Sequence, residues 1–160
     1  MRFLLRAPGA AFALLLLFPL LGLGPGAARA EEPEKVFPLS GAQVVPPSAS
    51  KATATAIVIL KGRTGKLEIH WQGLSGKPSR FEIRGPALAG QSGDLLFSLP
   101  VPKHLHAHAD SAEVSFSVAQ TRKKFFRDEQ TYLSVKTPHY PRGEVRGQII
   151  PTDEENDEDD

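Results

Sequence analysis

The fold is decided by residues 51–72, which read KATATAIVILKGRTGKLEIHWQ. Apolar side chains occupy every second position on both sides of the central Gly62-Arg63-Thr64-Gly65, and this period of two is typical of strands that bury one face. Two such runs joined by a short glycine-containing turn predict a β-hairpin. Ile57 and Ile59 also make the opposite face of the first run apolar, so we expect that strand to be covered on both sides over its second half.

The same alternation recurs along the rest of the chain. It predicts further strands at residues 36–40, 80–84, 95–99, 112–118, 132–136 and 144–149, about eight in all, separated by loops at 73–78, 85–93 and 138–143. We expect the strand at 36–40 to lie at an edge of the sheet. No helical period of useful length follows residue 30. The predicted fold class is all-β, either a small barrel or an antiparallel β-sandwich that is Greek-key-like, similar to superoxide dismutase or immunoglobulin-type sandwiches.

Residues 1–30 have the layout of a secretory signal peptide. Two arginines precede an apolar run over residues 11–23, and Ala28-Arg29-Ala30 places small residues where signal peptidase cuts. The apolar run is shorter than the roughly 20 residues that a membrane span needs, which disfavours a membrane anchor. We therefore expect a periplasmic or secreted protein whose mature chain starts near Glu31 and is not an integral membrane protein.

The rest of the chain divides into a basic body and an acidic end. Residues 35–152, the predicted domain, contain 16 Lys and Arg against 8 Asp and Glu, whereas seven of the eight residues at 153–160 are acidic. We expect 153–160 to be a disordered tail, because like charges repel and the tail has nothing apolar to bury. A sharper hypothesis is that this tail folds back on the basic body. The absence of cysteine excludes disulfides, thiolate nucleophiles and cysteine-based metal sites.

Several local motifs follow one another in a fixed order. They are Leu39-Ser40-Gly41-Ala42-Gln43, Pro46-Pro47, Trp71-x-Gly73-Leu74, Phe81-Glu82-Ile83-Arg84-Gly85-Pro86-Ala87, Tyr132-Leu133-Ser134-Val135-Lys136-Thr137, Tyr140-Pro141 and Gly143-Glu144-Val145-Arg146-Gly147-Gln148-Ile149. In this order and spacing they resemble the CHRD domain, first described in the animal protein chordin and common in secreted bacterial proteins. The resemblance implies a secreted, all-β domain, and so a fold and a location more than a function. Chordin itself binds growth factors of the bone morphogenetic class.

The chain departs from the family pattern at three positions. The family usually has two histidines where this chain has Glu82 and Arg84, and a third where it has Lys136. Two histidines at this spacing share a strand face, as in the copper site of superoxide dismutases, and a cationic Arg or Lys cannot replace an imidazole as a ligand. We instead expect Glu82 to form an exposed ion pair with Lys136 or Arg84, worth about 0–1 kcal/mol. The other family-motif positions that we single out are Gly85, Pro86, Thr137, Gly143, Glu144, Arg146 and Gly147, with Glu144 and Arg146 interpreted as structural.

The segment His104-Leu105-His106-Ala107-His108-Ala109-Asp110 contains three of the five histidines. If it is extended, His104, His106, His108 and Asp110 share one face, and neutral imidazoles are suitable ligands for zinc or copper. The alternative is a polar loop without metal, which Pro100 and Pro102 favour because proline disfavours a long strand here.

A basic cluster at Arg122, Lys123, Lys124 and Arg127 surrounds Phe125 and Phe126. It is a candidate patch for an anionic partner, such as lipid headgroups, lipopolysaccharide or an acidic polysaccharide. The alternative is a loop that the two phenylalanines fasten to the core. Nucleic acid is not expected as a partner of an exported protein.

No catalytic motif accompanies these features. The chain has no Gly-x-Ser-x-Gly elbow, His-Glu-x-x-His helix or phosphate loop. The function predicted from the sequence is a non-catalytic, cofactor-free binding protein that takes an extracellular or periplasmic protein, or an anionic glycan or lipid surface. The alternative is a periplasmic metal-binding protein that uses the histidine segment with zinc or copper. A redox activity like that of superoxide dismutase is a weaker idea, since histidines are missing at positions 82, 84 and 136.

Overall fold

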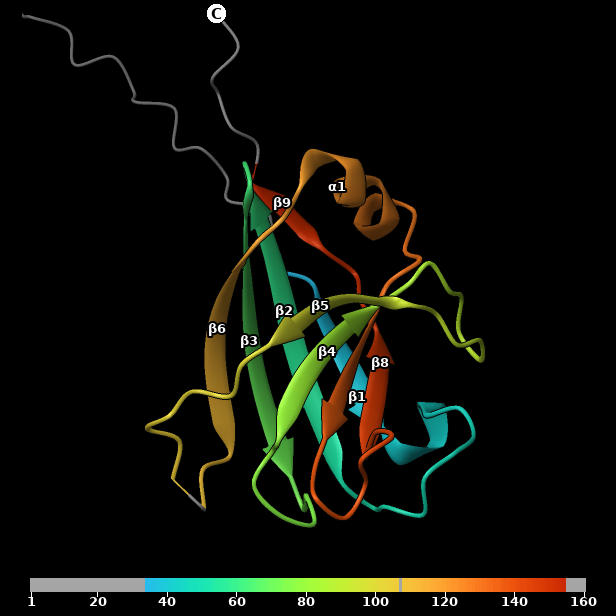
Figure 1. Cartoon of the computed structure of the whole chain (residues 1–160), viewed down its shortest axis with the longest axis vertical. Coiled ribbons are helices and arrows are strands. Elements are labelled where there is room, and N and C mark those ends of the chain that lie inside the picture. The colour runs from blue at the N-terminus through green and yellow to red at the C-terminus, as the bar shows by residue number, and fades with distance from the viewer. Residues whose placement is uncertain (1–33, 107, 155–160) are drawn as a thin grey trace, which may run out of the picture. The chain divides into compact units, whose positions relative to one another are not determined.

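The computed structural model describes residues 34–106 and 108–154, so the predicted signal peptide and residues 155–160 lie outside the described residues. The described chain forms nine strands, one 3-10 helix and one α-helix (Figure 1). The strands are β1 (Val36–Ser40), β2 (Thr53–Lys61), β3 (Thr64–Gln72), β4 (Arg80–Arg84), β5 (Leu95–Leu99), β6 (Ser111–Ser117), β7 (Tyr132–Lys136), β8 (Val145–Gln148) and β9 (Thr152–Glu154). The helices are η1 (Gly41–Gln43) and α1 (Gln120–Arg127).

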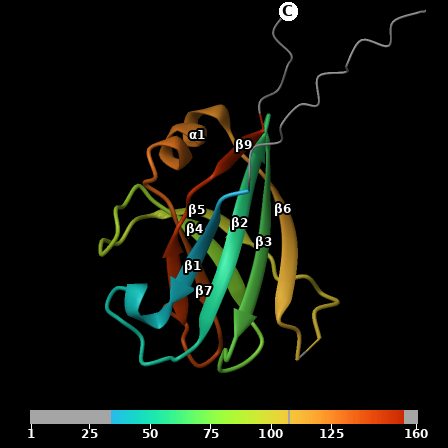
Figure 2. The same ribbon diagram turned by 180° about the vertical axis from the view of Figure 1, so that it is seen from behind.

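All nine strands belong to one sheet with the order β5-β4-β7-β8-β1-β2-β3-β6, and the short β9 lies parallel to β2. The other pairs are antiparallel. The sheet curls until its two end strands approach each other, since the rings of Phe97 on β5 and Phe116 on β6 have centroids 5.3 Å apart. Figures 1 and 2 show β4 and β5 on one side and β2, β3 and β6 on the other. The predicted all-β, sandwich-like fold is confirmed.

The alternating apolar residues form the core between these two layers. The largest fully buried side chains include Phe37, Leu67, Phe81 and Leu133, each from a different strand. The predicted β2–β3 hairpin is present, with Lys61 opposite Thr64. Its turn needs a glycine because Gly62 has a φ of +54°. The second half of β2 is covered on both faces as predicted, with Ile57 and Ile59 half-buried.

Two sequence-based expectations about the fold are wrong. The strand at 36–40 is not an edge, because β1 lies between β2 and β8, and the edges are β5 and β6. Residues 120–127 form helix α1 rather than a loop, although Phe126 is fully buried and does fasten the segment to the core. Strand β9 includes Asp153 and Glu154, and the other six residues of the predicted tail lie outside the described residues, where the prediction of disorder stands. Across the described residues, no helix combines the length and hydropathy required to cross a membrane.

Candidate functional site

The outer face of strands β4, β7 and β8 carries polar side chains that are buried. Glu82, Ser134 and Arg146 lie in one row across the three strands, and each is at most 4% exposed. Two loops, at residues 41–49 and 85–94, contact this face through hydrogen bonds such as those from Arg146 Nη2 to Leu88 O and from Ser48 Oγ to Glu144 O. Because these loops exclude water, the outer face of the sheet is a second, polar interior.

The three positions at which the chain departs from the family pattern meet on this face. Lys136 Nζ lies 2.9 Å from Glu82 Oε1, and Arg84 Nη1 lies 2.9 Å from Glu82 Oε2. Burial of Glu82 opposes its ionisation, but the hydrogen bonds from Lys136 and Arg84 outweigh burial and hold the pKa of Glu82 below its usual value. The carboxylate therefore stays charged and neutralises one of the two cations.

The predicted ion pair of Glu82 is present with both partners, but the expectation that it is exposed is wrong. The Glu82 side chain is only 5% exposed, and its partner Arg84 is held to the loop at 85–94 by a hydrogen bond from Nε to Gly93 O at 3.1 Å. A buried carboxylate costs several kcal/mol to leave unpaired, so this cluster fixes the packing of β4 against β7. The donor set of one carboxylate and two cations does not fit a metal ion.

Arg146 lies on the same face but has no acidic partner among the described residues. Its guanidinium lies over the ring of Tyr132, 3.5 Å from the centroid, and Nη2 donates to Leu88 O at 3.3 Å. Burial lowers the pKa of Arg146, as expected for a cation withdrawn from water without a counter-ion. An arginine remains protonated in proteins, so this site holds an uncompensated positive charge.

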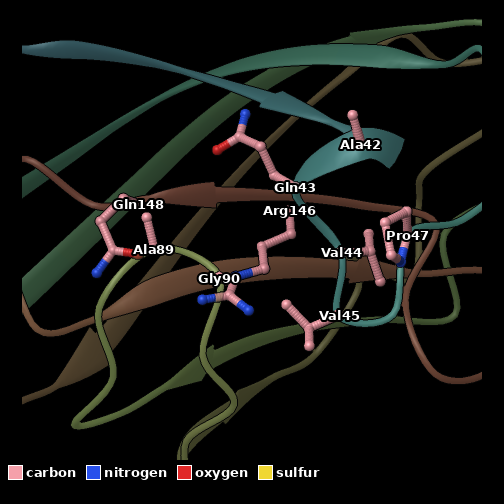
Figure 3. Close-up of a pocket in the computed structure, with 9 residues that line it drawn as sticks. All are labelled: Ala42, Gln43, Val44, Val45, Pro47, Ala89, Gly90, Arg146 and Gln148. Carbon is pink, nitrogen blue, oxygen red and sulfur yellow. The ribbon is translucent and has the colours of Figure 1, made fainter.

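A pocket of about 400 Å³ opens beside Arg146 (Figure 3). Its walls come from the two covering loops, with Val44, Val45 and Pro47 on one side and Ala89 and Gly90 on the other. The Arg146 side chain extends from β8 toward the loop at 89–90, and Gln148 lies beside Ala89. A partly apolar pocket with a few polar groups is the usual form of a small-molecule site.

Gln148 lines this pocket and carries a buried acceptor. Its Nε2 donates to Ala87 O at 2.9 Å and to Glu129 O at 2.7 Å. Its Oε1 is buried, and no hydrogen-bond partner for it lies in the part of the chain that the structure describes. Buried polar atoms are nearly always hydrogen-bonded, so an isolated acceptor beside a pocket indicates a place for a ligand or water donor.

Glu144, which we interpreted as structural from the sequence, is fully buried at the end of the polar face. Its Oε1 accepts hydrogen bonds from Ser50 Oγ and Ser75 N at 2.8 Å each, and its Oε2 accepts from Ser75 Oγ at 2.7 Å and Thr137 Oγ1 at 2.6 Å. Burial raises the pKa of Glu144, but these four donors lower it further than burial raises it. Through Ser50, Ser75 and Thr137, the Glu144 carboxylate connects three loops, and each of its two oxygens accepts two hydrogen bonds. These contacts support the interpretation of Glu144 as a structural residue.

The remaining family-motif positions surround these groups. Gly85 and Pro86 begin the covering loop at 85–94, and Thr137 follows β7. Gly147 is packed so closely on β1 that a Cβ atom would contact Pro38 O. Gly143 has a φ of +134°, and a Cβ there would lie 2.8 Å from Ser134 Oγ. The family-motif residues thus determine the close packing of the polar face as well as its charges.

The histidine segment is not the extended strand that the metal hypothesis requires. Residues 103–104 and 108 lie in turns, and His104, His106 and His108 are all exposed. Within residues 34–106 and 108–154, no group of three or more His, Asp or Glu side chains is placed to hold a metal. The segment is therefore a polar loop, as the alternative interpretation predicted, and its arrangement does not support the hypothesis of a zinc or copper site.

Two of the four basic residues of the predicted anionic-partner patch have partners within the fold. Arg122 Nη1 donates to Leu96 O, and its guanidinium lies 5.3 Å from the centroid of Phe97. Lys124 pairs with Asp128 at 3.3 Å. Lys123 and Arg127 remain as candidates for binding an anionic partner.

Sequence reasoning did not find Tyr132 and Gln148 as site residues. Both belong to the quoted family motifs, and both are polar residues on strands whose other face is apolar. That pattern is typical of a solvated face, and only the covering loops enclose it into a pocket. The available signal was the number of polar side chains that the motifs place on neighbouring strands.

Comparison with known proteins identifies one family. A family model described as the CHRD domain matches residues 36–149, which span the sheet from β1 to the residue after β8. No curated protein and no solved structure matches the chain significantly.

Proposed function

The chain belongs to the CHRD domain family, and on this premise we propose that it is an exported, non-catalytic binding protein that takes a negatively charged extracellular or periplasmic partner. The observation that carries this proposal is the pocket of about 400 Å³ beside Arg146, a buried arginine without an acidic partner among the described residues. A cation kept out of water by the fold is costly, and an anionic ligand group would compensate it.

The absence of catalysis is part of the proposal, and the state of the buried carboxylates supports it. General acid–base catalysis needs a group whose pKa lies near the working pH. The pKa values of Glu82 and Glu144 are instead lowered, and their oxygens are occupied by hydrogen-bond donors. We propose no cofactor, since two cations stand where the family usually has histidines.

Among anionic partners, an acidic surface glycan fits best. The body at 35–152 carries 16 basic and 8 acidic residues, which favours polyanions in general. A pocket with both apolar and hydrogen-bonding walls suits a single polar group that protrudes from a polymer. A lipid surface would require an exposed basic patch, and two of the four residues of the α1 cluster are already engaged within the fold.

The test fills the pocket without disturbing the core. Ala89 is exposed and lines the pocket, so Ala89→Trp should obstruct it. Ser115→Trp, at an exposed position of the edge strand β6, is the matched control. The two variants and the unmodified protein are compared by biolayer interferometry on immobilised polygalacturonate, neutral dextran and anionic lipid vesicles.

We expect binding to polygalacturonate that Ala89→Trp abolishes and Ser115→Trp retains. Equal binding by Ala89→Trp would contradict the pocket as the ligand site, and preference for vesicles would move the function to a lipid surface. Export is tested separately by N-terminal sequencing of the protein recovered outside the cytoplasm. A first residue near Glu31 would support export, and an intact N-terminus would contradict cleavage.

A further inference from the structure

We propose that the pocket recognises a carboxylate with a neighbouring hydroxyl group, as in a uronic acid, through Arg146 and Gln148. This inference rests on the proposed function, because it names the ligand class of the same pocket. It assigns each half of the ligand to a different side chain. Arg146 compensates the carboxylate, and Gln148 Oε1 accepts the hydroxyl hydrogen.

The first step concerns the charge that the fold leaves unbalanced. The two buried carboxylates of the polar face are already engaged: Glu82 pairs with Arg84 and Lys136, and Glu144 accepts four hydrogen bonds from hydroxyl and backbone donors. Neither contacts Arg146. The cation at the pocket therefore has no internal counter-ion within the described residues, and an anion has to come from outside.

The second step concerns the geometry of the arginine. One face of its guanidinium is occupied by the Tyr132 ring at 3.5 Å, which fixes the plane of the group. Among the described residues, the guanidinium donates one hydrogen bond to a protein acceptor, from Nη2 to Leu88 O. The other N–H groups lie at the edge of a fixed plane, and a planar carboxylate accepts two such N–H groups side by side.

The third step concerns Gln148, whose amide orientation is determined by its neighbours. Nε2 donates to two carbonyl oxygens, those of Ala87 and Glu129. Exchanging the amide nitrogen and oxygen would place Oε1 against both carbonyls, so the oxygen has to point the other way. That oxygen is buried, and no donor to it lies among residues 34–106 and 108–154. A ligand oxygen that carries no hydrogen, such as those of a phosphate dianion, would repel it, whereas a hydroxyl satisfies it.

The fourth step concerns size and shape. A pocket of about 400 Å³ lies near the lower end of the range for small-molecule sites, which suits one sugar residue, such as the terminal residue of a polymer. Val44, Val45 and Pro47 present apolar surface on one wall. The C–H groups of a sugar ring can pack there while its carboxylate and hydroxyl meet Arg146 and Gln148.

The experiment titrates the purified protein with a matched set of small probes by isothermal titration calorimetry. D-glucuronate has both groups, its methyl ester lacks the charge, cyclohexanecarboxylate lacks the hydroxyls, and glucose 6-phosphate and inorganic phosphate replace the carboxylate by phosphate. We expect D-glucuronate to bind and each of the other probes to bind at least about tenfold more weakly, the loss typical of one hydrogen bond to a charged group. No binding of D-glucuronate at about 10 mM, a level that detects even millimolar affinity, would overturn the inference.

Variants then assign the two roles. Arg146→Gln should lose about 10–100-fold in affinity for D-glucuronate. Gln148→Met should abolish the preference for D-glucuronate over cyclohexanecarboxylate. Arg146 and Gln148 also contribute to the structure, so two further variants are placed at the exposed rim residue Ala89, where they leave the fold intact. Through the added charge, Ala89→Glu should weaken and Ala89→Lys should tighten the binding of D-glucuronate, each about threefold.

The outcomes separate this inference from the proposed function. If the methyl ester binds as well as D-glucuronate and Ala89→Trp blocks both, the pocket is a ligand site but the carboxylate is not recognised, and the inference fails alone. If inorganic phosphate binds more tightly than D-glucuronate, the site is a phosphate site and the inference also fails. If Ala89→Trp alters no binding at all, both fail.

Discussion

Glu144→Gln should destabilise the protein by about 2 kcal/mol at pH 7. The four hydrogen bonds to its carboxylate are 2.6–2.8 Å long, and the residue is fully buried. In the glutamine, Oε1 still accepts two of these bonds, and the Ser75 and Thr137 hydroxyls can turn to accept from Nε2. A hydrogen bond to a charged group contributes about 1 kcal/mol more than one between neutral groups, so the four bonds together lose about 4 kcal/mol. Removing a buried charge recovers part of this, about 2 kcal/mol, because its desolvation no longer opposes folding.

The assay is urea unfolding followed by circular dichroism, with Glu113→Gln as the control. Glu113 has a side chain that is 62% exposed and pairs with Lys66 at 3.3 Å, so its loss should cost at most about 1 kcal/mol. Both variants keep the size of the side chain and remove one charge. A Glu144→Gln variant within about 0.5 kcal/mol of the unmodified protein would refute the account of four charge-assisted bonds.

The same carboxylate makes a prediction about pH. The pKa of Glu144 is lower in the folded protein than its ordinary value of 4.5, so the unfolded chain binds the proton more readily. The stability that Glu144 contributes is therefore fully present above pH 4.5 and is lost as the pH falls from there through the folded pKa. Glu144→Gln should show a shallower loss of stability over this acid range, and an unchanged slope would contradict the lowered pKa.

Three further predictions concern other parts of the molecule. Phe126→Ala should cost about 3–5 kcal/mol in urea unfolding, because Phe126 is fully buried between helix α1 and the core; a loss below about 1 kcal/mol would mean that α1 is not fastened there. Glu82→Gln should cost about 2 kcal/mol at pH 7 by leaving two cations unpaired, and a more stable variant would contradict the ion-pair cluster. Zinc should not raise the thermal midpoint of the protein, and a rise that is lost in the triple alanine variant of His104, His106 and His108 would restore the metal hypothesis.

The strands were predictable because each carries its own signal. In β3, apolar Leu67, Ile69 and Trp71 alternate with polar residues, and the structure buries the apolar three. The order of the strands was not predictable in the same way. Strand β1 looks like an edge in the sequence, but it pairs with both β2 and β8, and β8 lies more than 100 residues away along the chain. Alternation of polar and apolar residues predicts which face of a strand is buried, but it does not predict which strands lie next to it in the sheet.

Helix α1 was missed for a different reason. It has only eight residues, QTRKKFFR, so no full apolar period is visible, and its basic residues suggested a surface cluster instead. Its available signal was composition, because Gln, Arg and Lys are good helix formers. One buried side chain, Phe126, is enough to hold so short a helix against the sheet.

The candidate site was predicted only in part. The family motifs pointed to Glu82, Arg84, Lys136 and Arg146, and the structure places all four on one face. Their burial was not predictable, since it depends on loops at 41–49 and 85–94 that have no periodic pattern. For the same reason Gln148, whose buried oxygen contributes to the proposed ligand site, had no signal that separates it from an exposed strand residue.

The pairing of β8 with β1 determines how much of the chain must be present before the proposed ligand can bind. The pocket combines five residues that follow β1, which are Ala42, Gln43, Val44, Val45 and Pro47, with Arg146 and Gln148 on β8. A chain still emerging from the ribosome, or cut anywhere before residue 146, lacks the groups that we propose to hold the ligand. Binding would thus require the chain as far as Gln148, and ligand capture would report a molecule in which β8 has paired with β1.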